Sequence, residues 1–425
     1  MKKSKKIYLD YASATPLEKS VFSVMSKALR GEFANPSAIH DLGVHCKNMI
    51  EVYRKTIAQV LNAHSDEIVF TSGATESNNL AINGIVKKYA EDFFRSSGKV
   101  TRPLKNLPHI VTTNIEHASV LEVCKYLEKN KLAEVAYVPV EENGIVDPKN
   151  IKKALRPETI LVSVMYANNE IGTIQPIREI AKEIRHYNKL HNTKILFHID
   201  ATQAINYLDI NVEKLGIDMM SFNAGKIYGP KGIGILYIKR KTPISKIIFG
   251  GDQERGLRAG TENLASIAGF AEALKITEKI KEKEVKRLKK LQDYFIREII
   301  SKTDNIFRSS GEVSQTIKNS QFCEIIINGD RENRLPNNIN VTIPKIPSDL
   351  LVIELSARGI MVSAKSACKS GEEGESYVIR AIKPEANQET GSIRFSLGRM
   401  TKKEDIDFTL KSLKEILTKL KKWYT

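Results

Sequence analysis

The sequence predicts an α/β protein in which a large domain with a mostly parallel sheet precedes a smaller α+β domain. Three observations support this prediction. Strand-like and helix-like segments alternate through the middle of the chain, the pattern changes after about residue 264, and 425 residues exceed one ordinary core. We therefore expect a large domain at 17–264 and a small domain made of 1–16 and 265–425.

The expected strands of the large domain are short apolar runs rich in β-branched residues. They are Ile68–Thr71, His109–Thr112, Val135–Val140, Ile160–Val164, Ile195–Ile199 and Ile235–Ile238. Helical patterns separate several of them. One runs from Ile177 to Ile184 with the i, i+3, i+4, i+7 spacing of a one-sided helix, behind Pro176. This alternation of strands and helices favours a parallel sheet.

The remaining third of the chain has a different texture. A long Lys- and Glu-rich helix is expected at about Ala271–Ser301, and a last helix begins near Lys402. Thr401 and Glu404 have the spacing of a capping box for that last helix. Its expected buried stripe is Ile406, Leu410, Leu413, Leu417 and Leu420. Expected strands lie at Phe322–Ile327, Asn338–Ile343 and Ser392–Ser396, and expected surface insertions or loops at Ser96–Pro108 and Arg308–Pro336.

Charge and composition exclude some classes of protein. The net charge of +16 suggests nucleic-acid binding, but Lys alternates with Glu at helical spacing in Lys279–Lys290 and Lys411–Lys422. Solvated helix faces explain this better, so direct nucleic-acid binding is not expected. No apolar run approaches the ~20 residues that span a bilayer, and the first apolar stretch stops at Asp10. We expect a cytoplasmic protein without a membrane segment.

Three short segments carry residues typical of a bound cofactor. Thr71–Ser77 places small and hydroxyl residues where a strand meets a helix, which suits either a phosphate or a simple N-cap. Asp200 ends an apolar strand, where α/β sheets hold ligands, although it could also cap a helix. Lys226 lies between glycines after an apolar run and could form a Schiff base.

Together these segments point to pyridoxal phosphate (PLP). This cofactor needs an anchor for its phosphate, an acid for its pyridine nitrogen, a lysine for its aldehyde and a flat group over its ring. His117, which lies between the first two segments in the sequence, supplies the flat group. No single segment is specific, but the order and combination are.

The chain resembles the cysteine desulfurases of the class V, aspartate-aminotransferase-like PLP enzymes, of the nitrogen-fixation and iron–sulfur-assembly type. The resemblance extends from Tyr8 nearly to the C-terminus and implies the type I fold of PLP-dependent transferases. The segments that carry it are Tyr8–Ala12, Thr71–Asn79, Ser163–Gly172, His198–Gln203, Lys226–Gly232, Arg258–Thr261, Ser366–Cys368 and Ser392–Arg399.

The resemblance implies a role for each matching residue. Lys226 would hold the cofactor and move the Cα proton, and His117 would stack on the ring. Asp200 would pair with the pyridine nitrogen and Gln203 with the ring oxygen. Ala74 and Thr75 would bind the phosphate, together with Thr261 from the neighbouring subunit of a homodimer. Asn169 and Arg394 would hold the substrate carboxylate. Taken alone, Arg394 could equally form a structural salt bridge.

Cys368 is the expected acceptor of sulfur. It lies in a small, polar, Gly-containing segment, which is unusual for a core cysteine and suits a reactive thiol. The resemblance implies a long loop that passes sulfur to a scaffold or tRNA-thiolation protein. Cys46, Cys124 and Cys323 are expected to be packing residues. No metal is expected, except that Cys368 could transiently ligate an iron–sulfur cluster.

The chain departs from the family pattern beside the cofactor lysine. The family usually has His immediately before this lysine and Ser two residues before that His, and Gly225 and Asn223 stand there instead. Because the missing His normally helps to bind phosphate, cofactor affinity is in question. Asn223 is the residue that could compensate.

The expected reaction takes sulfur from L-cysteine, leaves a persulfide on Cys368 and releases L-alanine. One alternative is a selenocysteine lyase or another class V aminotransferase. The other is a scaffold of this fold, or a partner associated with nucleic acid, with little activity. The Cys368 segment argues against an aminotransferase but does not exclude selenocysteine. The third possibility rests on the net charge and on Gly225.

Overall fold

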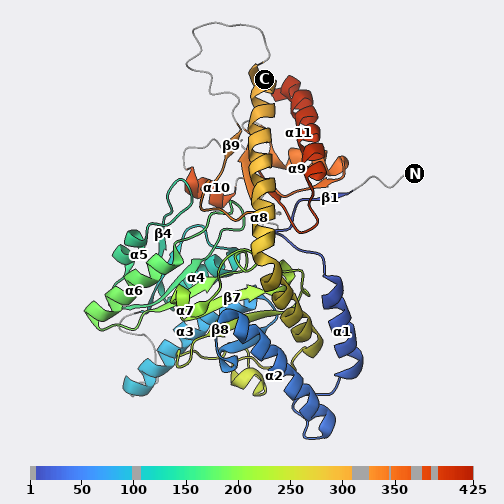
Figure 1. Cartoon of the computed structure of the whole chain (residues 1–425). Helices are drawn as coiled ribbons and strands as arrows, with labels where there is room; N and C mark the ends of the chain where they lie inside the picture. The colour runs from blue at the N-terminus through green and yellow to red at the C-terminus, as the bar shows by residue number, and fades with distance from the viewer. Residues whose placement is uncertain are drawn as a thin grey trace.

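The computed structural model describes residues 6–97, 107–308, 325–343, 346–364, 376–383 and 391–424. Figure 1 shows two tiers: a broad lower layer built around a large sheet, and a smaller upper one built around the end of a long helix. The predicted α/β fold with a mostly parallel sheet and an additional α+β part is confirmed.

Seven strands form the large sheet in the order β2-β8-β7-β6-β5-β3-β4. Their bounds are β2 Ile68–Thr71, β3 His109–Thr113, β4 Glu134–Val138, β5 Thr159–Met165, β6 Leu196–Asp200, β7 Met219–Asn223 and β8 Gly234–Ile238. Neighbouring strands from β4 to β7 are parallel, and β8 runs opposite to the six other strands, since it pairs antiparallel with both β2 and β7. The carboxyl ends of the six others therefore lie on one edge.

Helices cover both faces of this sheet because strand side chains alternate between them. On one face Phe70 and Val162 pack with the helices α2 Asp41–Leu61, α5 Pro148–Ala154, α6 Ile177–His191, α7 Val212–Leu215 and the start of α8 Leu264–Arg308. On the other, Val69 and Leu161 pack with α3 Ala74–Ser97 and α4 Ala118–Lys129. Helix α1, Lys19–Gly31, lies against α8 (Figure 1).

The upper tier has its own core. Strands β9 Ile326–Ile327, β10 Asn338–Thr342 and β12 Ser392–Ser396 form one sheet, and β1 Ile7–Tyr8 pairs with β11 Ile360–Met361. The later part of α8, with α9 Ser348–Ala357 and α11 Lys403–Tyr424, packs on them, and α10, Tyr377–Ile382, joins the core of the large sheet. Helix α8 enters both cores. The predicted division into one domain at 17–264 and another made of 1–16 and 265–425 stays a prediction.

Three local expectations need correction. Helix α8 begins at Leu264, ahead of the expected Ala271, because its first turns are buried on several sides and lack a one-sided pattern. The described part of Arg308–Pro336 is only partly at the surface, since residues 331–333 are exposed whereas Asn328, Arg334 and Leu335 are buried. Of the expected strand Phe322–Ile327, β9 keeps the last two residues, and 322–324 lie outside the described part.

The capping box expected at the last helix is also wrong by one residue. Thr401 Oγ1 accepts a hydrogen bond from the backbone N–H of Gly398 at 2.9 Å, so it belongs to the preceding turn. Instead the carboxylate of Asp405 accepts from the N–H of Lys402 at 3.0 Å. The expected buried stripe from Ile406 to Leu420 is confirmed.

Candidate functional site

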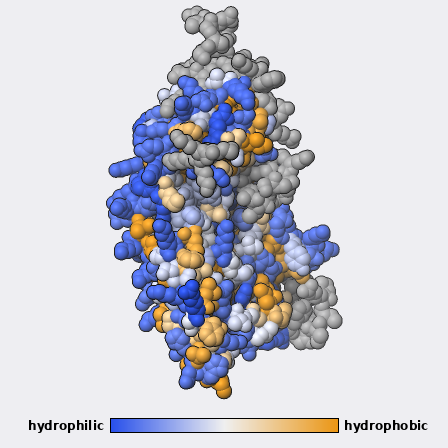
Figure 2. Space-filling view, turned by 90° about the vertical axis from the view of Figure 1, so that its right-hand side faces the viewer, coloured by the Kyte–Doolittle hydropathy of each residue, from blue (hydrophilic) through white to orange (hydrophobic). Residues whose placement is uncertain are grey.

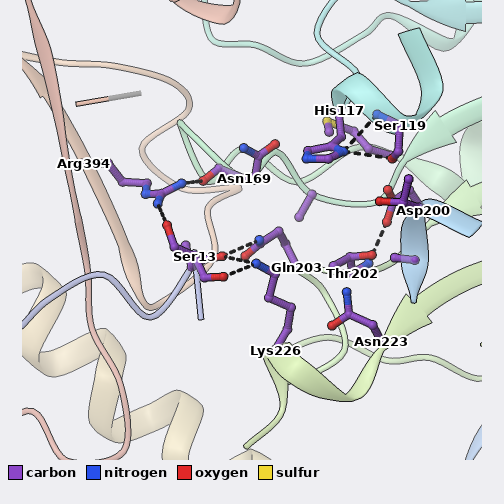
Figure 3. Close-up of a pocket in the computed structure, with 15 residues that line it drawn as sticks. Ser13, His117, Ser119, Asn169, Asp200, Thr202, Gln203, Asn223, Lys226 and Arg394 are labelled. Atoms are coloured by element: carbon purple, nitrogen blue, oxygen red, sulfur yellow. Dashed lines mark hydrogen bonds between the residues drawn. The ribbon is translucent and has the colours of Figure 1, made fainter. Parts of the chain in front are cut away.

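A cavity of about 180 Å³ opens where five strands of the large sheet end. Figure 3 shows His117 and Lys226 on opposite sides of it, with Arg394 and Asn169 toward one end and Asp200 toward the other. Its lining residues are Ala12, Ser13, Ala74, Thr75, His117, Ser119, Met165, Ala167, Asn169, Asp200, Thr202, Gln203, Asn223, Lys226 and Arg394. Parallel sheets bind ligands at this edge.

Lys226 enters the cavity from the short 3₁₀ turn Ala224–Lys226 that follows β7. Its Nζ donates to the backbone oxygens of Ala12, at 2.9 Å, and Ser13, at 2.5 Å. The amide of Asn206 donates to the Lys226 carbonyl at 2.5 Å and so fixes the turn. The amine therefore lies at the cavity, held by neutral carbonyls that a covalent partner can replace.

Asp200 presents a fixed carboxylate at the end of β6. Its Oδ2 accepts from the Asn78 amide at 2.8 Å and its Oδ1 from the backbone N–H of Thr202 at 2.9 Å. The residue is 6% exposed. Gln203, three residues on, donates to the carbonyl of Ala12 at 3.0 Å. A buried carboxylate in this position can hold a proton on a ring nitrogen.

His117 is the N-cap residue of α4. Its Nδ1 accepts from the backbone N–H of Ser119 at 3.1 Å, which leaves Nε2 to carry the ring proton. Glu116 beside it is fully buried, and burial raises the pKa of its carboxyl group to about 8. Hydrogen bonds from Thr113 and from the Met165 N–H, at 2.7 and 2.9 Å, hold that side chain. Ser119 thus positions the ring of His117, and the neighbouring Glu116 side chain is fixed by its own hydrogen bonds.

The start of α3 has the features expected of an anion site. Ala74 and Thr75 line the cavity in its first turn, where backbone N–H groups have no partner within the helix. Gly234 of β8 makes this turn possible, because a Cβ there would lie 2.6 Å from the Gly73 backbone. Asn223 lines the same cavity. The phosphate interpretation of this turn gains support over a simple N-cap.

Arg394 and Asn169 form the opposite end of the cavity. Arg394 donates to Asp10 Oδ1, Ser13 Oγ and the Asn169 carbonyl, at 2.7, 2.7 and 2.8 Å. The structural salt bridge considered from the sequence is therefore present, with Asp10. It does not use the whole guanidinium group, because the buried Nε has no hydrogen-bond partner within the described residues.

Four buried polar atoms around the cavity lack partners in the part of the chain that the structure describes. They are Asn169 Oδ1, Thr202 Oγ1, Asn223 Oδ1 and Arg394 Nε. Buried polar groups are rarely left without hydrogen bonds unless a ligand or water completes them. With an amine, a fixed carboxylate and a helix N-terminus in the same cavity, these residues fit a phosphorylated pyridine aldehyde such as PLP.

One expected residue lies elsewhere, and another falls outside the described residues. Thr261 is exposed, away from the cavity, in the segment that precedes α8. Cys368 lies outside the described residues, as does Cys323, whereas Cys46 and Cys124 are free and buried, as expected of packing residues. Within the described ranges there is no group of His, Cys, Asp and Glu suited to a metal ion. Nor does any helix there have the length and apolar character to cross a membrane.

Several residues of the site were not identified from the sequence. Asn78 donates to Asp200 and to Ser119 Oγ, both at 2.8 Å, and Ser13 contacts both Lys226 and Arg394. Asn78 belongs to the Thr71–Asn79 segment, which could have signalled it. Ser13 carries no comparable signal, because Lys226 and Arg394 lie more than 200 positions away from it in the sequence.

Comparison with known proteins gives consistent matches. The family model described as Aminotransferase class-V matches residues 7–408. A protein named cysteine desulfurase IscS from Dictyoglomus turgidum is 42% identical over 417 residues, covering 98% of this chain and 96% of that one. One named cysteine desulfurase IscS 1 from Archaeoglobus fulgidus is 38% identical over 414 residues, covering 97% of each.

Solved structures agree with these matches. A structure titled NifS-like protein superposes with a TM-score of 0.82 at 34% identity, covering 98% of this chain and 100% of that one. Another, titled SspA in complex with cysteine, gives a TM-score of 0.73 at 32% identity, covering 92% and 99%.

Proposed function

Because the chain belongs to the aminotransferase class-V family, among its cysteine desulfurases, we propose that its cavity binds PLP and L-cysteine. The protein is a PLP-dependent cysteine desulfurase, which removes sulfur from L-cysteine and releases L-alanine. The observation that carries this function is the placement of Lys226 and Asp200 around one cavity with Arg394. The relatives' names support this reading over a selenocysteine lyase or an aminotransferase.

Different residues of the cavity would bind different parts of PLP. Lys226 would form the covalent link through Nζ, Asp200 would keep a proton on the pyridine nitrogen, and His117 would cover the ring. The other proposed contacts are Gln203 for the ring oxygen, and Ala74, Thr75 and Asn223 for the phosphate. When bound, PLP withdraws electrons from the α-carbon of the amino acid.

The substrate is held at the other end of the cavity. Arg394 and Asn169 would bind its carboxylate. Arg394 Nε and Asn169 Oδ1, which have no hydrogen-bond partner among the described residues, are available for this and for the amino group. This orients the α-carbon toward Lys226, whose Nζ takes and returns the Cα proton. The Cys368 thiolate then attacks the substrate sulfur. The S–S bond of a persulfide forms as the Cβ–S bond breaks, and the protonated carbon fragment leaves as alanine.

The decisive experiment measures both products. Purified protein is incubated with PLP, L-cysteine and a reductant, and sulfide and alanine are assayed together. We expect equal amounts from the wild type, and almost none from Lys226→Ala or Cys368→Ala. Cys46→Ala is the matched control, since this thiol is buried in α2 and should be dispensable. A protein that binds PLP but turns over only L-selenocysteine, or transfers amino groups, would contradict the assignment.

We also propose a homodimer. Large apolar side chains are exposed on α1, on α2 and on the segment between them: Phe22, Leu29, Phe33, Ile39, Leu42, Val44 and Val52. Figure 2 views the molecule from the side on which α1 lies in Figure 1, and it shows hydrophobic patches among polar surface on the lower half. Exposed apolar groups that recur on neighbouring elements favour a protein interface. A second copy would also give the exposed Thr261 a site to act on.

Mixed dimers test this arrangement. Lys226→Ala and Thr261→Ala copies are each expected to have low activity, because one lacks the lysine and the other a phosphate contact. If Thr261 acts across the interface, mixing the copies restores one site that combines Lys226 of one subunit with Thr261 of the other. Light scattering would report the dimer independently. A monomer, or no recovery on mixing, would contradict the proposal.

The acceptor of the sulfur and the location of the protein stay proposals. We propose a protein acceptor, either an iron–sulfur scaffold or a tRNA-thiolation protein, which receives the persulfide sulfur of Cys368. Transfer of labelled sulfur from cysteine to each purified candidate would distinguish the two. Fractionation of cells that express the tagged chain would test the predicted cytoplasmic location.

A further inference from the structure

A negative charge lies at the same helix N-terminus as the proposed phosphate site. Glu76 is in the first turn of α3, directly after Ala74 and Thr75. Its carboxylate accepts a hydrogen bond from the backbone N–H of Ser72 at 2.7 Å, which holds it at the turn. A carboxylate there satisfies the helix dipole but also repels a phosphate dianion at the same terminus. This charge therefore requires a counter-charge.

Arg258 provides that counter-charge. Its Nε lies 3.0 Å from Glu76 Oε1, and its NH2 group lies 3.4 Å from Oε2. Both side chains are largely buried, with 25% of Arg258 and 12% of Glu76 exposed. Burial alone would raise the pKa of Glu76, but the hydrogen bonds from Arg258 and Ser72 lower it below its ordinary value. Glu76 is therefore ionised and paired.

The segment that carries Arg258 is fixed to the strand that leads into the phosphate turn. Glu254, Arg255 and Gly256 all have left-handed backbone conformations, with φ values of 47°, 57° and 75°. Such a turn persists only where its surroundings hold it. Here Arg54 forms a bidentate ion pair with the buried Glu254, at 2.7 and 2.8 Å. The backbone N–H of Phe70 in β2 donates to the same carboxylate at 2.8 Å.

We infer that Arg258 is a positioning residue of the phosphate site, which neutralises Glu76 so that the start of α3 can accept a dianionic group. This role rests on the proposed function, because it presupposes PLP in the cavity. Arg258 acts through Glu76 rather than on the phosphate. It is not among the residues that line the cavity.

The two charges predict a distinctive pattern among variants. Arg258→Met leaves the Glu76 carboxylate unpaired and should weaken PLP binding about tenfold, the order expected for one charge at a helix terminus. Glu76→Gln can still accept from Ser72 and should bind PLP at least as well as the wild type. The double variant Glu76→Gln, Arg258→Met should recover most of the lost affinity. Arg258→Lys should retain most of the wild-type affinity for PLP.

The experiment compares PLP with pyridoxal, which has the same ring and aldehyde but no phosphate. Loaded protein is diluted, and the release of each compound is followed by its absorbance. Arg258→Met should accelerate the release of PLP about tenfold and leave that of pyridoxal nearly unchanged. Arg240→Met is the matched control, since Arg240 forms a bidentate ion pair with Asp66 at 2.8 Å on the surface. Thermal unfolding of every variant monitors the fold.

The outcomes separate this role from its alternatives. Equal acceleration for PLP and pyridoxal in Arg258→Met would overturn it, because the effect would then be structural. A double variant as weak as Arg258→Met would also overturn it, because Arg258 would then act on the phosphate itself. A wild type that holds PLP no better than pyridoxal would refute the proposed phosphate site and this role together.

Discussion

Ser376 and Glu170 are joined by a 2.5 Å hydrogen bond in which the serine hydroxyl donates to a buried carboxylate. Glu170 is next to Asn169 in the sequence, and Ser376 is the N-cap of α10, where its Oγ accepts from two backbone N–H groups. Tyr377 adds a second link, a 2.6 Å hydrogen bond to the carbonyl of Glu116. The start of α10 is thereby attached to both the proposed substrate end and the His117 side of the cavity.

Replacing Ser376 tests the strength of this attachment. Ser376→Ala removes a donor to the buried Glu170 and the side-chain cap of α10, so we expect the free energy of unfolding to fall by about 1–3 kcal/mol. Ser376→Thr keeps the hydroxyl and should lose less. Urea denaturation of both variants measures the difference. An unchanged midpoint for Ser376→Ala would show that the bond contributes nothing.

Asn78 should control the carboxylate of Asp200. Asn78→Ala removes the 2.8 Å hydrogen bond to Asp200 Oδ2, and bonds to charged groups are worth about 1.5–3 kcal/mol. We expect cysteine turnover to fall roughly tenfold to a hundredfold while the fold is kept. Asn130→Ala, at the exposed C-cap of α4, is the control and should be fully active. Turnover equal to the wild type would exclude this role for Asn78.

The residue before the cofactor lysine can carry a side chain. A Cβ at Gly225 would meet its nearest neighbours, Asn223 Oδ1 and Lys231 Cγ, at 3.6 Å. We expect the free energy of unfolding of Gly225→Ala to lie within about 1 kcal/mol of the wild-type value. Gly225→His should slow PLP release, because it restores the histidine that the family uses to bind phosphate. Gly229→Ala is the contrasting control. Its Cβ would lie 2.8 Å from that of Ala224, so it should be destabilised by about 1–3 kcal/mol. Faster PLP release from Gly225→His would contradict the expectation.

Glu116 should make stability depend on pH. Burial raises the pKa of its carboxyl group from 4.5 to about 8, so between these values the folded protein keeps a proton that the unfolded chain has lost. The stability that the protonated Glu116 contributes is complete below pH 4.5. It declines as the pH rises to about 8, by at most about 1.4 kcal/mol per pH unit. Glu116→Gln stays neutral and lacks this slope. The stability of Glu116→Gln relative to the wild type should therefore increase with pH. Denaturant midpoints across this range provide the measurement.

Much of the fold could be predicted because the strands of the large sheet are buried on both faces. Such strands are continuous apolar runs, and Ile68–Thr71 and Ile160–Val164 show this directly. The strand-end position also predicted where Asp200 and Lys226 would lie. The start of α8 was missed for the opposite reason. A helix buried on several sides, such as Leu264–Leu274, has no polar face to reveal its period.

Buried polar residues that pair with each other were also difficult to predict from the sequence. Asn328 was expected in a surface loop, yet it is buried because its amide donates to Asn340 and Thr342, at 2.7 and 2.8 Å. Asn78 escaped notice in the same way. Its partners Asp200 and Ser119 are distant in sequence, and composition alone cannot show that such groups will meet.

The pairing of β1 with β11 constrains how the chain is made. Ile7 takes its place opposite Ile360, so the first strand has no partner until about 350 further residues have left the ribosome. At 5–20 residues per second this wait lasts roughly 20–70 s. Throughout that time Ile7 and Leu9, which end fully inside the upper core, are exposed to solvent and to chaperones. The order of synthesis, N-terminus first, is thus the reverse of the order in which this end of the protein becomes protected.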